Sequence, residues 1–291
     1  YPDESYDCDG NCIAEIDNCG VCSGDGSSCY LIDLHEGANL ISFYTLPEDM
    51  SVSNIIGDAS GNIYGIIGEG VNASYFNGMW LGSLTEISLE GGYWMLVENT
   101  DITLSGSGTG YDVDRAYNLH AGANLISYSS IYSLDLSTAI PDDVEDQFIG
   151  ILSEGSSAAN TNFGWIGSLT YFESGKGYWV IVSDDLSFSY ESGGMTRTKI
   201  NPYIETLPSG NQFDVIQSTN QAFYFIDDIT LNEGVIEEGD WLLSYKGNVL
   251  TGIRQWQGTM IDIPAMGVGE NTGTDNYFED GDIPTFKLLK E

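Results

Sequence analysis

The sequence predicts an all-β protein in which two copies of a β-sandwich or barrel-like domain precede a C-terminal β-sandwich. Three observations support this: a gapless internal repeat, short runs rich in β-branched and aromatic residues, and cysteines confined to one end. A chain of 291 residues is long enough for more than one domain. We divide it into the N-terminal segment, repeat 1, repeat 2 and the C-terminal module, with boundaries at 1–30, 31–113, 114–195 and 196–291.

The N-terminal segment contains every cysteine of the chain. The five are Cys8, Cys12, Cys19, Cys22 and Cys29. A segment too short to bury a core is commonly held by disulfides in an oxidising compartment, so two disulfides and one remaining cysteine are expected. Zinc or redox chemistry at Cys19 and Cys22 is the alternative, although both histidines lie outside the segment. The pairing stays open, and the odd cysteine predicts a free thiol or a bond to another chain.

Oxygen-bearing side chains alternate with glycine in this segment and again near the C-terminus. The candidate ligands are Asp7, Asp9, Asn11, Asp25, Asp280 and Asp282. Carboxylates and amides spaced around a glycine turn resemble part of a calcium loop, although the spacing of an EF-hand is not met. Calcium is therefore the expected cofactor, and plain acidic turns are the alternative.

The chain is strongly acidic, with 44 Asp and Glu against 8 Lys and Arg and a net charge of −36. Residues 1–114 contain no Lys or Arg at all. A field of this sign repels phosphate backbones and anionic lipid surfaces, which argues against nucleic acid as a partner. Bound divalent cations or a saline habitat would relieve the repulsion. No apolar run is long enough to cross a bilayer, so no membrane insertion is expected.

Residues 31–195 contain a duplication with one constant offset. Leu34–Ser42 ("LHEGANLIS") returns as Leu119–Ser127 ("LHAGANLIS"), 85 residues later. "GGYWMLV" returns as "KGYWVIV", "WLGSLT" returns as "WIGSLT", and a Glu-Gly pair recurs, all at this offset. Two copies of this length predict two similar domains rather than a solenoid.

Each copy has the pattern of a small β-domain. "NLISFY" and "NLISYSS" are short strand-like runs, whereas "YWMLV" and "YWVIV" are continuous apolar runs typical of buried strands. Clusters of Ser, Gly and Asn separate the runs, as in sandwiches and barrels. One short helix with a Ser N-cap is expected in each copy, at "SVSNIIG" and "LSTAIPD". His35 and His120 occupy equivalent positions and are expected to be structural residues at strand edges.

Four tryptophans also recur at equivalent positions. They are Trp80, Trp94, Trp165 and Trp179. The apolar neighbours of Trp94 and Trp179 predict core packing, and a platform for stacking sugars is the alternative. A glycosylation sequon begins at Asn72 in the first copy only.

Two of these regions resemble modules of extracellular proteins. "CGVCSGDGSSC" (Cys19–Cys29) resembles the Cys-Gly-Val-Cys-Gly-Gly-Asp motif of secreted metalloproteases with thrombospondin motifs and of large bacterial surface proteins. The repeats resemble the "GWNLIS…GKGYWV" modules of secreted bacterial and archaeal surface proteins, with Ala38 and Ala123 where an aromatic is usual. These resemblances imply an extracellular location, and no catalytic residue comes with them.

The C-terminal module follows a stretch of linker-like composition at residues 191–211. Strands are predicted at "QAFYFIDDITL", at "DWLLSYKGNVLTGIRQW" with a hairpin turn at residues 246–248, and at "IPTFKLL". "GDWLLSYKGNVLTGIRQW" and "GDIPTFKLL" resemble a β-sandwich module near the C-termini of secreted proteins from marine and related bacteria. The match rests on Gly239, Asp240, Tyr245 and Gly247.

No nucleophile elbow, His-Glu-x-x-His or Walker motif occurs, so the sequence predicts no enzymatic activity and no catalytic residue. Tandem duplication and terminal cysteines predict a secreted structural protein, a subunit of an extracellular filament, surface layer or adhesive matrix. It would self-associate into a homopolymer through the N-terminal segment and open sheet edges, stabilised by calcium. The alternative is a carbohydrate-binding or adhesion module of a larger cell-surface protein, with glycans as partners.

Overall fold

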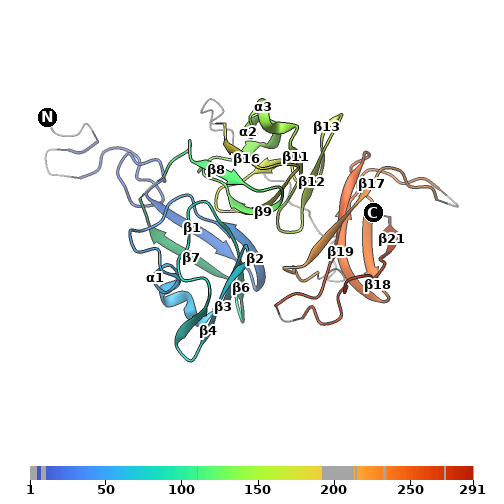
Figure 1. The fold of residues 1–291 in the computed structure, drawn as a ribbon, viewed down its shortest axis with the longest axis horizontal. Helices are drawn as coiled ribbons and strands as arrows, with labels where there is room; N and C mark the ends of the chain where they lie inside the picture. Colours follow the sequence, from blue (N-terminus) through green and yellow to red (C-terminus); the bar gives the residue numbers. More distant parts are fainter. Residues whose placement is uncertain are drawn as a thin grey trace.

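The computed structural model describes most of the chain, over residues 5–7, 11–109, 111–191, 213, 215–231, 234–271 and 273–290. Strands make up 47% of the residues and helices 7%, and the strands form several antiparallel sheets, so the chain is all-β as predicted. Figure 1 shows repeat 1 on the left, repeat 2 above it and the C-terminal module on the right.

Repeat 1 consists of a five-stranded antiparallel sheet, a two-stranded ribbon and a short helix. The sheet strands, in spatial order, are β2 (Gly37–Ser42), β6 (Gly92–Val97), β3 (Ile63–Gly68), β4 (Val71–Phe76) and β5 (Met79–Gly82). The ribbon pairs β1 (Cys29–Leu34) with β7 (Ile102–Ser107). Helix α1 (Val52–Ile56) has the expected serine N-cap, because the Ser51 side chain accepts a hydrogen bond from the backbone of Asn54, and the 3-10 turn η1 (Gly57–Gly61) follows it.

Repeat 2 has the same strand order. Its sheet strands are β9 (Gly122–Ser127), β15 (Gly177–Val182), β11 (Phe148–Leu152), β12 (Ser157–Thr161) and β13 (Gly164–Gly167). The two-stranded elements are β8 (Ala116–Leu119) with β16 (Leu186–Ser189), and β10 (Leu134–Asp135) with β14 (Tyr171–Phe172).

The short helices of repeat 2 are α2 (Leu136–Ala139) and α3 (Asp142–Glu145). The predicted serine N-cap of α2 was wrong. The cap is Asp135, whose carboxylate accepts hydrogen bonds from both the backbone and the hydroxyl of Ser137. A carboxylate satisfies the exposed N–H groups of a first turn as well as a hydroxyl does.

The C-terminal module packs a two-stranded sheet against a three-stranded one. Its strands are β17 (Gln221–Ile226) paired with β20 (Ile261–Met266), and β18 (Trp241–Lys246) between β19 (Val249–Gln255) and β21 (Thr285–Leu289). The β18–β19 hairpin turns through Gly247, whose φ of 60° favours glycine, as the sequence predicted.

Strand β6 is buried on both faces, which explains its unbroken apolar sequence. Tyr93, Met95 and Val97 enter the core of repeat 1. Trp94 and Leu96 point to the opposite face and belong to a different cluster. Repeat 1 therefore has apolar surface on both sides of its sheet, and only one side faces its own core.

The second cluster joins the two repeats, and we call it the shared cluster. Its buried members are Ala38, Leu40, Trp94, Leu96 and Leu125. Leu125 belongs to repeat 2, and Trp179 of repeat 2 packs against the same cluster. The outer face of each central sheet is thus covered by the other repeat.

Two disulfides staple the N-terminal segment. They join Cys12 to Cys22 and Cys19 to Cys29, with Cα–Cα distances of 5.7 and 5.5 Å. Cys19 and Cys22 therefore lie in separate bridges, which removes the zinc or redox alternative. Cys8 lies outside the described residues. Disulfides of this kind indicate a non-cytoplasmic environment.

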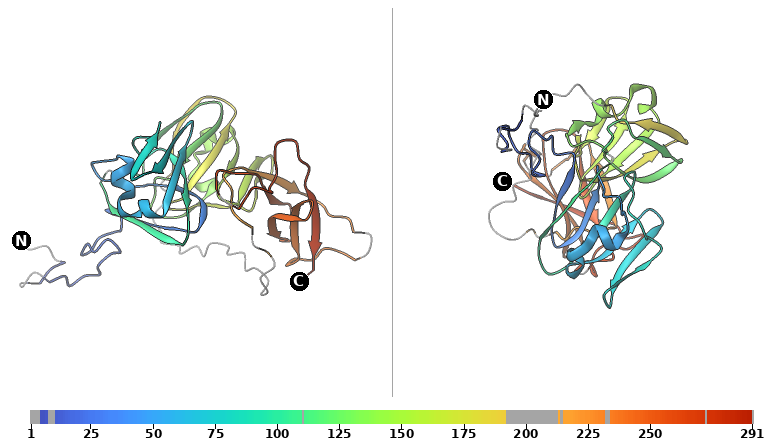
Figure 2. Two further views of the ribbon diagram at one scale, coloured as in Figure 1. Left: turned by 90° about the horizontal axis from the view of Figure 1, so that it is seen from below. Right: turned by 90° about the vertical axis from the view of Figure 1, so that its left-hand side faces the viewer.

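The described part of the N-terminal segment projects from repeat 1, at the end of the molecule opposite the C-terminal module (Figures 1 and 2). Cys29 is the first residue of β1, so the Cys19–Cys29 bridge anchors the segment to the ribbon of repeat 1.

Candidate functional site

The polar contacts between the two repeats occur in reciprocal pairs. His35 Nε2 lies 2.6 Å from Glu154 Oε1, and His120 Nε2 lies 2.7 Å from Glu69 Oε1. His120 is the counterpart of His35, and Glu154 is the counterpart of Glu69, at the repeat offset of 85. Each repeat therefore contributes one histidine and one glutamate, and the two repeats are related by an approximate two-fold axis.

The same carboxylates also fix the facing strands. Glu154 Oε2 accepts a hydrogen bond from the backbone N–H of Leu40 at 3.1 Å, and Glu69 Oε2 accepts one from Leu125 at 2.7 Å. Both leucines belong to the shared cluster. The Glu-Gly pair that recurs in the sequence thus supplies the carboxylate that holds the opposite repeat in register.

Each histidine ring is placed between two oxygen acceptors. His35 Nδ1 lies 2.7 Å from the carbonyl oxygen of Glu36, and His120 Nδ1 lies 2.9 Å from that of Ala121. A ring with acceptors at both nitrogens satisfies both contacts only as the doubly protonated imidazolium. The histidines are therefore structural cations, which is the structural role that the sequence predicted for them.

These contacts raise the pKa of both histidines. For His35 the hydrogen bond to Glu154 dominates, and partial burial and the charge of Lys176 oppose it. For His120 the carbonyl of Ala121 contributes most, followed by Glu69, with Asp185 adding a smaller electrostatic effect.

Glu154 is largely buried, with a side chain 13% exposed. Burial alone would raise its pKa, but the hydrogen bond from His35, the charges of Lys176 and His35, and the N–H of Leu40 together hold the pKa below its usual value. Because the pKa of His35 is raised above 6.5 and that of Glu154 is lowered below 4.5, both members of the pair are ionised at mildly acidic pH.

The C-terminal module docks on repeat 2 through a buried ion pair of its own. Arg254 Nη2 lies 3.1 Å from Asp262 Oδ2, and both side chains are almost completely buried. Asp262 accepts hydrogen bonds from the backbone N–H of Ser168 and, at 3.0 Å, from its hydroxyl. Arg254 Nη2 donates to the carbonyl of Gly155 at 2.6 Å. Both members of the pair thus also bind repeat 2, while Arg254 Nε donates to the carbonyl of Asp262 within the module at 2.9 Å.

Gln221 completes the contact. Its Oε1 accepts from the backbone N–H of Gly155 at 3.1 Å, and its Nε2 donates to the carbonyl of Ser153 at 2.8 Å. We call Ser153, Gly155 and Ser168 the docking surface of repeat 2. The side chains of Asp262, Arg254 and Gln221 thus all meet backbone groups or the serine hydroxyl of this surface.

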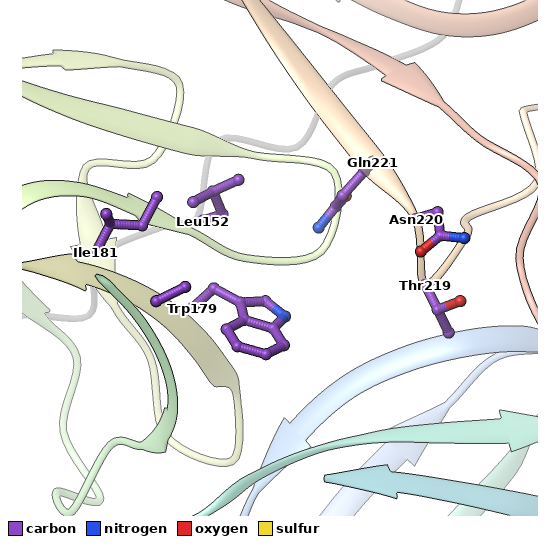
Figure 3. Close-up of a pocket in the computed structure, with 7 residues that line it drawn as sticks. Leu152, Trp179, Ile181, Thr219, Asn220 and Gln221 are labelled. Atoms are coloured by element: carbon purple, nitrogen blue, oxygen red, sulfur yellow. The ribbon is translucent and has the colours of Figure 1, made fainter. Parts of the chain in front are cut away.

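A cavity of about 340 Å³ opens beside this contact. Trp179 and Leu152 line it from repeat 2, and Thr219, Asn220 and Gln221 line it from the C-terminal module (Figure 3). The indole nitrogen of Trp179 faces the side of Thr219 and Asn220 in Figure 3, and its N–H donates to no acceptor among the described residues. An aromatic face beside amide and hydroxyl groups can bind a ligand with both apolar and polar faces.

The four repeated tryptophans occupy different environments. Trp94 is buried in the shared cluster, and Trp179 is half-buried at the cavity. Trp80 packs against the core of repeat 1 and Trp165 against that of repeat 2, where its indole donates to Glu145 at 2.7 Å. Asn72, the predicted glycosylation site, is exposed on β4.

The candidate calcium ligands of the N-terminal segment hydrogen-bond within their own turns. Asp7 accepts from the backbone and the side-chain amide of Asn11, at 2.8 and 2.9 Å. Asp25 accepts from the backbone of Ser27 at 2.9 Å. Asp9 lies outside the described residues.

Near the C-terminus, Asp282 pairs with Lys246 at 2.7 Å, and that hydrogen bond lowers its pKa. Asp280 is exposed. Within the described ranges, no three His, Cys, Asp or Glu side chains gather where they could hold a metal ion. Calcium stays a prediction.

Sequence reasoning did not identify the docking residues Arg254, Asp262 and Gln221. One signal was available, because Arg254 interrupts the apolar strand "VLTGIRQW". A lone arginine in a strand that is otherwise buried requires a charged or carbonyl partner nearby. Its partner on the other module could not be read from the pattern.

No protein-family model matches the chain, and neither a curated protein nor a solved structure matches it. Where the structure describes the chain, it contains no helix of the length and apolar character that a membrane span requires. The function is therefore argued from the residues and their geometry.

The reciprocal pairs predict a pH-dependent stability. The folded-state pKa of each histidine lies above the unfolded value of about 6.5, so the pairs stabilise the fold fully below about pH 6.5. That contribution is lost as the pH rises through the folded pKa. We expect the Tm of the native chain to fall as the pH rises from about 6 to about 9, and the double variant H35Q/H120Q to show a smaller fall.

Thermal unfolding of both proteins across this range measures the difference. At acidic pH the dependence on pH is opposite for Glu154, because folding lowers its pKa. The stability that Glu154 contributes is present above its unfolded-state pKa of about 4.3 and is lost as the pH falls further, through the folded-state pKa. Parallel Tm profiles for the native chain and H35Q/H120Q between pH 6 and 9 would contradict the assignment.

The buried ion pair predicts a large cost for one substitution. Asp262→Asn leaves Arg254 buried without its charge partner, and breaking such a pair costs about 3–5 kcal/mol. We expect the C-terminal module to release from repeat 2, with faster hydrogen exchange at the amides of Gly155 and Ser168.

Asp282→Asn is the matched control for this change. It breaks the partly exposed pair with Lys246, which solvent screens, so it should shift the denaturant midpoint much less than Asp262→Asn does. Equal denaturant midpoints and equal exchange rates for the two variants would mean that the buried pair does not hold the module.

Proposed function

We propose that this chain is a secreted structural protein, a subunit of an extracellular filament, surface layer or adhesive matrix. The observation that carries the proposal is how the modules are fixed to one another. The repeats share a buried apolar cluster and reciprocal His–Glu pairs, and the C-terminal module is held by Arg254 and Asp262. Modules of one chain commonly meet through small polar interfaces that permit motion. Buried charge and shared apolar packing favour a fixed arrangement, as a structural subunit needs.

The ends of the molecule support the same role. The N-terminal segment and the C-terminal module lie at opposite ends (Figures 1 and 2), so copies joined end to end would extend an assembly. Four cysteines are bonded to one another within the segment. A disulfide at Cys8 would therefore have to reach another molecule. Calcium between the acidic surfaces would reduce the repulsion that a charge of −36 imposes.

Light scattering on the full chain tests this function. We expect the molar mass to rise with protein concentration in calcium and to fall when a chelator is added. Sodium chloride at matched ionic strength separates specific bridging from screening, which any salt provides. A monomer at every concentration, in calcium and in salt, would contradict a structural polymer.

Glycan binding is the second candidate function, and the Trp179 cavity favours it. A sugar ring could stack on the indole while the indole N–H and the side chains of Thr219 and Asn220 meet its hydroxyl groups. The role would be that of an adhesion module of a larger cell-surface protein.

A screen of glycans by quenching of tryptophan fluorescence tests it. We expect a glycan that quenches the native chain to lose at least about tenfold in affinity in Trp179→Phe, because loss of one hydrogen bond and part of the stacking area costs about 1.4 kcal/mol or more. Trp165→Phe is the control, since that indole is paired with Glu145. Quenching that is unchanged in Trp179→Phe would place the binding elsewhere.

A further inference from the structure

The docking surface of repeat 2 is present a second time, on repeat 1. Ser168 lies in "WIGSLT", and its counterpart Ser83 lies in "WLGSLT". Gly155 follows a glutamate of the reciprocal pairs, and its counterpart Gly70 follows the other one. Two of the three docking residues are therefore duplicated, and the third, Ser153, corresponds to Gly68, which also has the backbone carbonyl that Gln221 contacts in repeat 2.

The backbone geometry of the second copy is the same. Gly70 has a φ of 68° and Gly155 a φ of 66°. Gly82 and Gly167, the residues before the two serines, have φ values of 148° and 140°. Few residues other than glycine adopt these conformations. The two surfaces therefore present their backbone groups with matching local geometry.

The hydrogen bonds that shape the two surfaces also correspond. The N–H of Leu84 donates to the carbonyl of Asn72 at 2.8 Å, and the N–H of Leu169 donates to that of Ser157 at 2.9 Å. These residues are counterparts at the repeat offset. The loop that carries Ser83 is thus already in the conformation that Ser168 has when the C-terminal module is docked.

Within the described residues, no hydrogen bond from another module reaches the copy on repeat 1, and we call this copy vacant. Gly70 and Ser83 are exposed, and neither backbone N–H donates a hydrogen bond to a described residue. The Ser83 hydroxyl accepts one within repeat 1, from the backbone N–H of Asn72 at 3.2 Å. In Figure 1, β13 of repeat 2 lies on the side of the C-terminal module, whereas β4 lies at the bottom of repeat 1, away from the module. Leu81, Gly82 and Ser83 are exposed, while their counterparts in repeat 2 are partly covered.

Exposed apolar side chains surround the vacant copy. Phe76, Met79 and Leu81 are 62%, 60% and 51% exposed on the β4–β5 hairpin. In repeat 2 the counterparts of Phe76 and Met79 are Thr161 and Gly164. An open edge strand with exposed apolar side chains is a typical site of protein association. The two hairpins therefore carry their exposed apolar side chains at different positions, since repeat 2 has Phe163 where repeat 1 has Gly78.

We propose that the vacant surface, formed by Gly70, Ser83 and the β4–β5 hairpin, receives the C-terminal module of a second copy of this chain. The inference rests on the proposed function and specifies its contact. Arg254, Asp262 and Gln221 all belong to the module, so the module carries its side of the contact intact. It leaves repeat 2 of its own copy and forms equivalent contacts on repeat 1 of the next. Domain exchange of this kind re-forms existing contacts and so requires little new interaction energy.

The contact joins two different surfaces, so it does not close on itself as a two-fold dimer does. Each chain has one module and two surfaces for it, and one surface is therefore vacant in every copy. Repetition of such a contact produces an open filament, or a ring if the rotation closes. Leu81 would be covered in the exchanged form, as its counterpart Ile166 is partly covered in repeat 2, and mass action favours that form at high protein concentration.

Lysine substitutions on the exposed β4–β5 hairpin test the proposal. We expect the full-length double variant M79K/L81K to keep its fold, because both side chains are exposed, and to associate at least about tenfold more weakly than the native chain. The matched control is L31K/I149K, which adds the same charge at side chains that are 49% and 53% exposed on β1 and β11, away from the β4–β5 hairpin and the C-terminal module. It should associate like the native chain in light scattering.

A second experiment, in which the Asp262→Asn chain is mixed with the native chain, tests the proposal without using M79K/L81K. The chain with Asp262→Asn can accept a module on repeat 1 but has lost the buried pair with which its own module docks. Added to the native chain, it should shorten the assemblies in proportion to its fraction, whereas Asp282→Asn should not.

The outcomes separate the two proposals. Association that persists in M79K/L81K, or assemblies that Asp262→Asn does not shorten, would overturn the exchanged contact and leave the structural function standing. A native chain that stays monomeric at every concentration and salt would overturn both.

Discussion

Burial of the outer face of each central sheet is the constraint on which the arrangement of the molecule depends. The strands of a sheet with one solvent-exposed face alternate apolar and polar residues, but β6 is apolar at every position after its first glycine. A single repeat would therefore expose Leu40, Trp94 and Leu96 to water. Pairing of the repeats removes these side chains from water, and the reciprocal His–Glu contacts fix the register in which the sheets meet. Each repeat has the strand order of a complete domain, but both faces of its sheet are buried only when the two repeats pack together.

Cationic side chains stand at each junction between the repeats and the C-terminal module, which matters in a chain of net charge −36. Arg115, the first basic residue of the chain, contacts Glu90 and the carbonyl of Leu89 in the preceding repeat. Arg254 performs the same function between repeat 2 and the C-terminal module, and the imidazolium rings do so between the repeats. Acidic modules repel one another, so cations at each junction offset the repulsion at the point where it would otherwise open the molecule.

The sequence predicted the local structure well and the contacts between modules poorly, for a physical reason. Strand runs, the β18–β19 hairpin and the first helix cap depend on neighbours in the chain, and patterns of period two or a few turn residues reveal them. The contact of His35 with Glu154 spans 119 residues, and no periodicity encodes it. The unbroken run around Trp94 did predict burial on both faces, but not that the other repeat provides the cover. Which cysteines pair, and that Asp135 rather than a serine caps α2, also depends on tertiary geometry.

Duplication gave this chain two kinds of interface with different consequences. The contact between the repeats is reciprocal, so it satisfies both copies of the Glu-Gly turn and closes within the chain. The contact with the C-terminal module uses the same turn and the serine of "GSLT", but only one module exists to meet two surfaces. A symmetric pair with a single asymmetric partner necessarily leaves one surface unmatched. The turn that closes the repeats onto each other is therefore also the feature that leaves repeat 1 open to another molecule.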